Sequence, residues 1–179
     1  FNYYFIVGGK EVGRAEAFVF PKESKFVTAI GKEFSFRPSN VQLKTENISW
    51  QRINPHEIAD WDSFKNERLN FKIGEIKFSS AASGAASKVG LNNLKFEATN
   101  NTVYNYWGVD FVILLYSGSG IAAVNKYTLP EFMSGQNRQI TLVWPGDLPQ
   151  ISKVTVTPEI QILDKNVYIK YEGGAGEEK

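Results

Sequence analysis

Apolar and polar residues alternate along most of this chain in short runs, and this period of two is typical of β-strands with one buried face. The runs are rich in aromatic and β-branched residues, and Gly, Pro, Asn or Ser stands between them. No long stretch has the period of an amphipathic helix. The pattern therefore predicts an all-β fold, with strands at 2–7, 12–20, 25–30, 41–50, 69–78, 94–98, 107–116, 121–129, 138–144 and 154–163.

Several turns in this pattern have a specific sequence signature. Gly8 and Gly9 separate the first two strands, and Gly-Gly suits the positive φ of a tight hairpin turn. The sequence SGSG at 117–120 predicts a second hairpin. The alternation of the fifth predicted strand changes register across Gly74, which predicts a β-bulge. The run at 107–116 is strongly apolar, so we expect it to be a central strand covered on both faces.

The beginning of the chain is repeated in outline about a hundred residues later. A shift of 109 residues places Val7 on Tyr116 and Pro21 on Pro130, with a Gly/Ser turn following the first pair. A shift of 113 residues places SNVQLKTE on SKVTVTPE. Both copies therefore have the order strand, tight turn, strand, Pro-led turn and third strand. Because the matched features keep the same order, we interpret them as a tandem repeat.

Strands at this spacing predict a β-sandwich, and the repeat predicts two of them in tandem. We expect a first sandwich at 1–53, a junction at 54–68, a second sandwich at 69–171 and a flexible tail at 172–179. The low-complexity stretch SSAASGAAS at 79–87 predicts a flexible surface loop within the second sandwich.

The two expected sandwiches differ in how they begin. Two strands, 69–78 and 94–98, precede the repeated part in the second copy, whereas none precedes it in the first. We therefore expect the first sandwich to be incomplete at its N-terminus. Its missing strands are expected upstream in the natural protein or from another chain, because an incomplete sandwich exposes an edge and part of its core.

Residues 110–116, DFVILLY, resemble the FxLYD-like group of immunoglobulin-type domains. The likeness continues through AVNKYTL, SGQNRQITLVWP and VTVTPEIQIL, although Ser117 stands where Asp is usual. It covers 69–169 and, as a truncated copy, 1–53. Such domains resemble the tandem extracytoplasmic domains of uncharacterised, membrane-anchored bacterial proteins of candidate phyla. The resemblance implies immunoglobulin-like sandwiches, an upstream membrane segment, a location at the cell surface and no catalytic residues.

Composition narrows the chemistry that this chain can perform. The formal net charge of +1 gives no field to attract nucleic acid or an anionic membrane. The chain has no cysteine, so a disulfide framework, a thiolate metal site and a Cys nucleophile are excluded. His56 is the only histidine, and no G-x-S-x-G turn presents a serine. No run approaches the roughly 18 apolar residues that span a bilayer. We expect neither enzyme activity nor a cofactor.

The junction at 54–68 is polar and irregular, with room for one short helical turn. It contains three neighbouring carboxylates, Glu57, Asp60 and Asp62. Calcium between tandem β-domains is held by such groups, because this hard cation takes roughly six to eight oxygen ligands. These residues are the candidate calcium site. The alternative is a polar linker that its charges keep solvated, since no D-x-D-x-D-G loop is present.

The sequence VYNYWG at 103–108 gathers three aromatic residues, Tyr104, Tyr106 and Trp107, at the entrance of a strand. Alternation sends the two tyrosines to one face and Trp107 to the other. One of these faces is the core, where a buried aromatic residue is expected. The three residues are the candidate site for a carbohydrate or a peptide.

Three hypotheses for the function follow. The first is a non-catalytic cell-surface module that serves as a spacer or as a protein-interaction and adhesion element. The second is a β-sandwich that binds carbohydrate or peptide through the Tyr104–Trp107 end. The third is a fibre or pilus-like subunit completed by a strand from a neighbouring copy. A protein partner or a neighbouring copy is thus expected, and nucleic acid is not.

Overall fold

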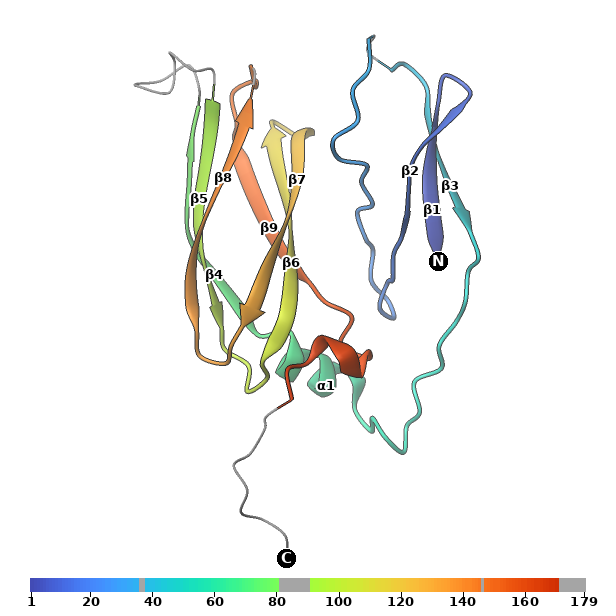
Figure 1. Cartoon of the computed structure of the whole chain (residues 1–179), viewed down its shortest axis with the longest axis vertical. Helices are drawn as coiled ribbons and strands as arrows, with labels where there is room; N and C mark the ends of the chain where they lie inside the picture. Colours follow the sequence, from blue (N-terminus) through green and yellow to red (C-terminus); the bar gives the residue numbers. More distant parts are fainter. Residues whose placement is uncertain (36–37, 81–90, 146, 171–179) are drawn as a thin grey trace, which may run out of the picture. The chain divides into compact units, whose positions relative to one another are not determined.

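The computed structural model describes residues 1–35, 38–80, 91–145 and 147–170, and Figure 1 shows the path of the chain. Most of the loop expected at 79–87 and all of the tail expected at 172–179 lie outside the described residues. The described part is mostly β, with nine strands in three small antiparallel sheets and one short α-helix. It divides into two units, Phe1–Ala59 and Asp60–Lys179, and the boundary falls inside the expected junction.

The first unit contains one three-stranded sheet. Its strands are β1 (Asn2–Val7), β2 (Lys10–Glu16) and β3 (Val41–Glu46), in the order β2-β1-β3. The bounds of β1 are as predicted, while β2 and β3 end earlier than the sequence pattern indicated. Gly8 and Gly9 form the predicted hairpin turn, with φ of 55° and 78°, values that residues with a Cβ rarely adopt.

The segment between β2 and β3 departs from the sequence prediction. Residues 25–30, predicted as a strand, form no strand in the structure. The Tyr3 hydroxyl ties this segment to the sheet by donating to the Thr28 carbonyl at 2.9 Å. Gly13 permits the close approach, because a Cβ at this position would clash with the Ala29 Cβ. The predicted strand does not form because a side-chain hydrogen bond holds this segment to the sheet, whereas a strand needs paired backbone groups.

The second unit contains two three-stranded sheets, which face each other in Figure 1. One has the order β4-β5-β8 and the other the order β7-β6-β9. Their strands are β4 (Phe71–Ser79), β5 (Leu91–Asn100), β6 (Tyr106–Ser117), β7 (Gly120–Phe132), β8 (Asn137–Pro145) and β9 (Lys153–Glu159). The helix α1 (Trp61–Arg68) precedes them and the 3₁₀-helix η2 (Lys165–Val167) follows them.

The core of the second unit lies between its two sheets. The rings of Phe96 on β5 and Phe111 on β6 meet edge to face at 5.8 Å, and those of Phe71 on β4 and Phe132 on β7 stack at 5.8 Å. Full burial of such a side chain contributes about 1.5–3 kcal/mol. Buried apolar residues come from both sheets and include Leu94, Phe96, Ala98, Val109, Phe111, Ile113, Leu115, Leu129, Phe132 and Ile140.

Three local predictions for the second unit are confirmed. All five residues from Phe111 to Leu115 are buried, so β6 is covered on both faces, and it lies in the centre of its sheet. Ser117 pairs with Gly120 across the predicted hairpin. The register of β4 against β5 shifts between Gly74 and Lys77, where the predicted bulge lies.

The helix α1 occupies part of the expected junction, where the sequence predicted at most one helical turn. Asp60 caps it, and Leu69 closes its last turn by donating its N–H to the Lys65 carbonyl at 2.8 Å. The helix contains no buried residue. The hydrophobic pattern therefore gave no signal for it, although its cap and charges did.

The sheet of the first unit and one sheet of the second have the same construction. In both, a tight hairpin supplies a central and an edge strand, and a later strand pairs antiparallel with the other edge of the central strand. The first turn residues, Gly8 and Gly118, have φ of 55° and 58°. They are 110 residues apart, so the turns correspond one residue later than the sequence match indicated. The sequence match had aligned Gly8 with Ser117, because a comparison of sequences contains no information on backbone conformation.

Candidate functional site

A buried asparagine fixes the loop that carries the predicted aromatic residues. The side-chain amide of Asn100 donates to the carbonyls of Tyr104, at 2.9 Å, and Phe132, at 3.1 Å. Its oxygen accepts from the N–H and the hydroxyl of Thr102, at 3.0 Å and 2.7 Å. Both donors and both lone pairs of this amide are thus used, and Asn100 serves to hold the loop between β5 and β6.

Tyr106 is a core residue rather than a ligand-binding one. Its ring is fully buried, and its hydroxyl donates to the Arg68 carbonyl at 2.7 Å, which anchors the end of α1. Burial raises the pKa of this phenol well above its usual value. The ring of Tyr104 lies 6.5 Å from that of Tyr106, and the Arg68 guanidinium lies 4.6 Å from the Tyr104 ring. The two tyrosines therefore share one aromatic cluster.

Trp107 lies on the opposite face of β6 from Tyr106. Its side chain is 55% exposed, while that of Tyr106 is fully buried. The predicted alternation is therefore confirmed, and of the three residues only Trp107 presents most of its ring to solvent. Of the three residues of the candidate carbohydrate or peptide site, Trp107 is therefore the most accessible to a ligand.

Trp107 lines a depression of about 530 Å³ together with a segment far along the chain. Small-molecule sites typically measure roughly 300–1,000 Å³. The remaining lining residues are Lys165, Asn166, Tyr168, Ile169 and Lys170. The two lysines were not predicted from the sequence, because they follow Trp107 by about sixty residues and only strand pairing brings them beside it.

Backbone pairing holds the wall of this depression. Tyr168 forms an antiparallel bridge with Tyr106, and the Ile169 N–H donates to the Asn105 carbonyl at 2.9 Å. The Tyr168 hydroxyl donates to the Ile162 carbonyl at 2.7 Å, and burial raises the pKa of this phenol. The segment after η2 is thus fixed beside β6, which preorganises the depression.

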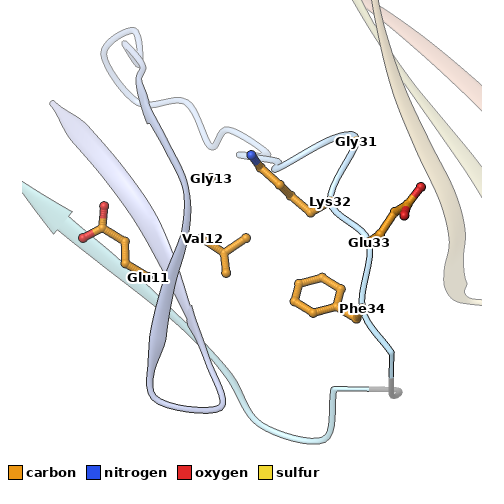
Figure 2. Close-up of a pocket in the computed structure, with 7 residues that line it drawn as sticks. All are labelled: Glu11, Val12, Gly13, Gly31, Lys32, Glu33 and Phe34. Carbon is orange, nitrogen blue, oxygen red and sulfur yellow. The ribbon is translucent and has the colours of Figure 1, made fainter.

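A second hollow, of about 460 Å³, lies in the first unit between β2 and residues 31–34. Figure 2 shows the side chains of Val12 and Phe34 pointing toward each other across it, while Glu11 points away. Glu11 instead accepts hydrogen bonds from the Arg14 guanidinium at 2.7 Å and 2.8 Å, which lower the pKa of its carboxyl. Arg14 also pairs with Glu46 on β3. The hollow is therefore lined by the apolar side chains of Val12 and Phe34 and by the side chain of Lys32.

Two of the three candidate calcium ligands, Asp60 and Glu57, have local partners for their carboxylates. The Asp60 carboxylate accepts from the N–H groups of Asp62 and Ser63, at 3.0 Å and 3.2 Å, and from the Ser63 hydroxyl at 2.9 Å. These bonds, that from the Ser63 N–H foremost, lower the pKa of Asp60. Glu57 accepts from the Asn54 amide at 3.3 Å. Across the described residues, no three His, Cys, Asp or Glu side chains gather in a way that could hold a metal ion.

No protein-family model matches the sequence, and no curated protein matches it. Within the part of the chain that the structure describes, no helix is long and apolar enough to cross a membrane.

Proposed function

We propose that this chain is a tandem pair of immunoglobulin-like β-units from a cell-surface protein, and that it acts without catalysis as a spacer or protein-interaction element. The observation that carries the proposal is the shared construction of the sheets β2-β1-β3 and β7-β6-β9. Repetition of one β-unit along a chain extends a protein and multiplies its surfaces. The immunoglobulin-like assignment rests on this construction and on the resemblance of residues 110–116.

The polar side chains of the second unit support a structural role. Asn100 fixes a loop, Tyr106 anchors α1 and Asp60 caps the same helix. Each of them binds backbone groups of its own fold. Polar side chains that are hydrogen-bonded to the backbone in this way stiffen the module rather than act on a substrate as a nucleophile or a general base.

Protease treatment of intact cells tests the proposed location. In the native organism, an antibody against this chain should detect the full-length protein before treatment and lose it when protease is added outside the cells. A cytoplasmic protein of the same organism serves as the control and should stay intact. If the chain is degraded only after lysis, the cell-surface proposal is wrong.

A strand-completed subunit is the second candidate, because one edge of the first unit is open. The strand β3 pairs only with β1 among the described strands, and its Val41 and Leu43 side chains are about half exposed. An exposed apolar edge strand is a template for strand addition. Sedimentation velocity of the full chain should show association that grows with concentration and disappears in Leu43→Lys. A monomer at all concentrations would exclude this candidate.

A further inference from the structure

The depression at Trp107 has a rigid floor and wall, which is the first requirement of a binding site. Trp107 belongs to β6, and the opposite wall follows η2 and is paired to β6 by the Tyr106–Tyr168 bridge. The Asp164 carboxylate caps η2 by accepting from the Asn166 N–H at 2.9 Å. Little ordering is therefore needed when a ligand enters, and preorganisation of this kind favours affinity.

The charge of the depression selects the kind of ligand. Lys165 and Lys170 both line it and both are exposed, and none of its lining residues within the described part of the chain is acidic. Asp164 is adjacent in sequence to Lys165, but its carboxylate is bound to the Asn166 N–H. Two ammonium groups at one small site favour a ligand that carries carboxylate or sulfate groups.

The exposed indole selects the shape of the ligand. A flat aromatic ring at the surface of a rigid strand stacks against the apolar C–H face of a sugar ring. A peptide that added a strand here would need unpaired backbone groups. The Ile169 N–H is already bound to Asn105, and Tyr168 is already bridged to Tyr106. The lining therefore offers side chains rather than a free strand edge, which favours a saccharide over an acidic peptide.

We propose that this depression binds an acidic saccharide. The sugar ring stacks on Trp107, and Lys165 and Lys170 bind its acidic groups. Asn166, which also lines the depression, supplies a side-chain amide for the sugar hydroxyls. This site goes beyond the proposed function, because a spacer requires no ligand, and either proposal can fail without the other.

The test is a calorimetric titration of the full chain with trigalacturonate at low ionic strength. The methyl-esterified trisaccharide serves as the matched ligand, because it keeps the sugar rings and removes the three charges. The acid should bind and the ester should bind about tenfold more weakly or not at all. Raising the salt concentration should weaken the binding of the acid, because exposed charge pairs are screened.

Variants locate the site. Trp107→Ala should weaken binding of the acid about tenfold through loss of stacking. Lys165→Gln/Lys170→Gln should weaken it about fivefold and remove most of its salt dependence. Lys72→Gln/Lys95→Gln removes the same charge from exposed positions of β4 and β5 and should bind as the unchanged chain does. Trp50→Ala, which removes an exposed indole from the first unit, is the matched aromatic control.

Several outcomes overturn the proposal. Absence of binding by the unchanged chain does so, as does equal binding of the acid and its ester. Equal losses in Lys165→Gln/Lys170→Gln and in Lys72→Gln/Lys95→Gln would show a general charge effect rather than a site. Tighter binding of an oligoglutamate peptide than of trigalacturonate, sensitive to Trp107→Ala, would assign the depression to acidic peptides instead.

Discussion

Each unit contains a sheet of the same construction, but the two sheets differ in what covers them. In the second unit, β4-β5-β8 packs on β7-β6-β9, and sixteen apolar side chains of the described residues are buried. In the first unit, the segment between β2 and β3 lies beside the related sheet, and three apolar side chains of the described residues are buried. The same strand order thus produces a large core in one place and a small one in the other. What lies opposite a sheet, rather than the sheet itself, determines the size of the core.

This difference predicts unequal stability. Each fully buried apolar side chain contributes about 1.5–3 kcal/mol, so a unit with few of them has little to offset the entropy of ordering its chain. We expect amide hydrogens of β1 to exchange through local opening at lower free energy than those of β6.

Removal of one phenylalanine from the sheet of each unit gives the most direct contrast. Phe111 is fully buried, and Phe111→Ala should lower the free energy of unfolding of the second unit by about 3–5 kcal/mol. Phe5 is half-buried, and Phe5→Ala should lower that of the first by about 1–2 kcal/mol. Hydrogen exchange measured by NMR reports on each unit separately. Equal losses would show that the first unit has a core as tightly packed as the second.

The amide of Asn100 is the second target, because no polar side chain among the described residues of the first unit is buried as it is. Asn100→Ala leaves buried backbone groups without partners and should lower the free energy of unfolding of the second unit by about 2–3 kcal/mol. Asn93→Ala, on the same strand, should change it by less than about 0.5 kcal/mol. Urea denaturation measures both. A similar small loss in the two variants would contradict the structural role of Asn100.

Substitution of Gly13 tests the packing of the first unit. Gly118, in the second unit, is the control because its backbone conformation is similar. Both have positive φ, but only a Cβ at Gly13 would meet the Ala29 side chain. Gly118→Ala should cost about 1 kcal/mol and Gly13→Ala about 2 kcal/mol. In the double variant Gly13→Ala/Ala29→Gly, the steric part should be recovered. If Gly13→Ala costs no more than Gly118→Ala, the segment at Ala29 does not pack against β2 in solution.

Alkaline pH should weaken the second unit through its buried tyrosine. Tyr106 has a pKa raised by burial, so above about pH 10 the unfolded chain releases this proton while the folded unit retains it. Stability is therefore full below about pH 10 and falls as the pH rises, with a limiting slope of about 1.4 kcal/mol per pH unit for one group. Tyr106→Phe should reduce the slope in urea titrations between pH 9 and pH 11. An unchanged slope would contradict the burial of the phenol.

The smallest expected effect concerns Asp60. Asp60→Ala removes the cap of α1 and should lower the melting temperature slightly, whereas Asp60→Asn keeps a capping oxygen and should not. Neither calcium nor a chelator should change these melting temperatures if the carboxylate only caps the helix. A calcium-dependent rise that Asp60→Asn abolishes would restore the calcium site that the sequence suggested.

Local features were predicted well from the sequence. The hairpin glycines, the bulge at Gly74 and the split of Tyr106 from Trp107 all depend on neighbouring residues, and each was found. The sequence predicted no more than one helical turn where α1 forms, because its apolar residues form no buried stripe, although Asp60 and the charges of its ends marked it. Lys165 was missed because strand pairing, which no local pattern reveals, brings it to Trp107.

The bulge in β4 has a consequence for crowded surroundings. As the edge strand of its sheet, β4 presents backbone groups that a neighbouring molecule could pair with. The register shift after Gly74 interrupts that row, Glu75 adopts a φ of 50°, and Lys77 lies 3.2 Å from the Glu75 carboxylate. A distorted, charged edge is a poor template for strand addition. At this edge, the second unit can therefore lie close to a neighbouring copy without merging the two sheets.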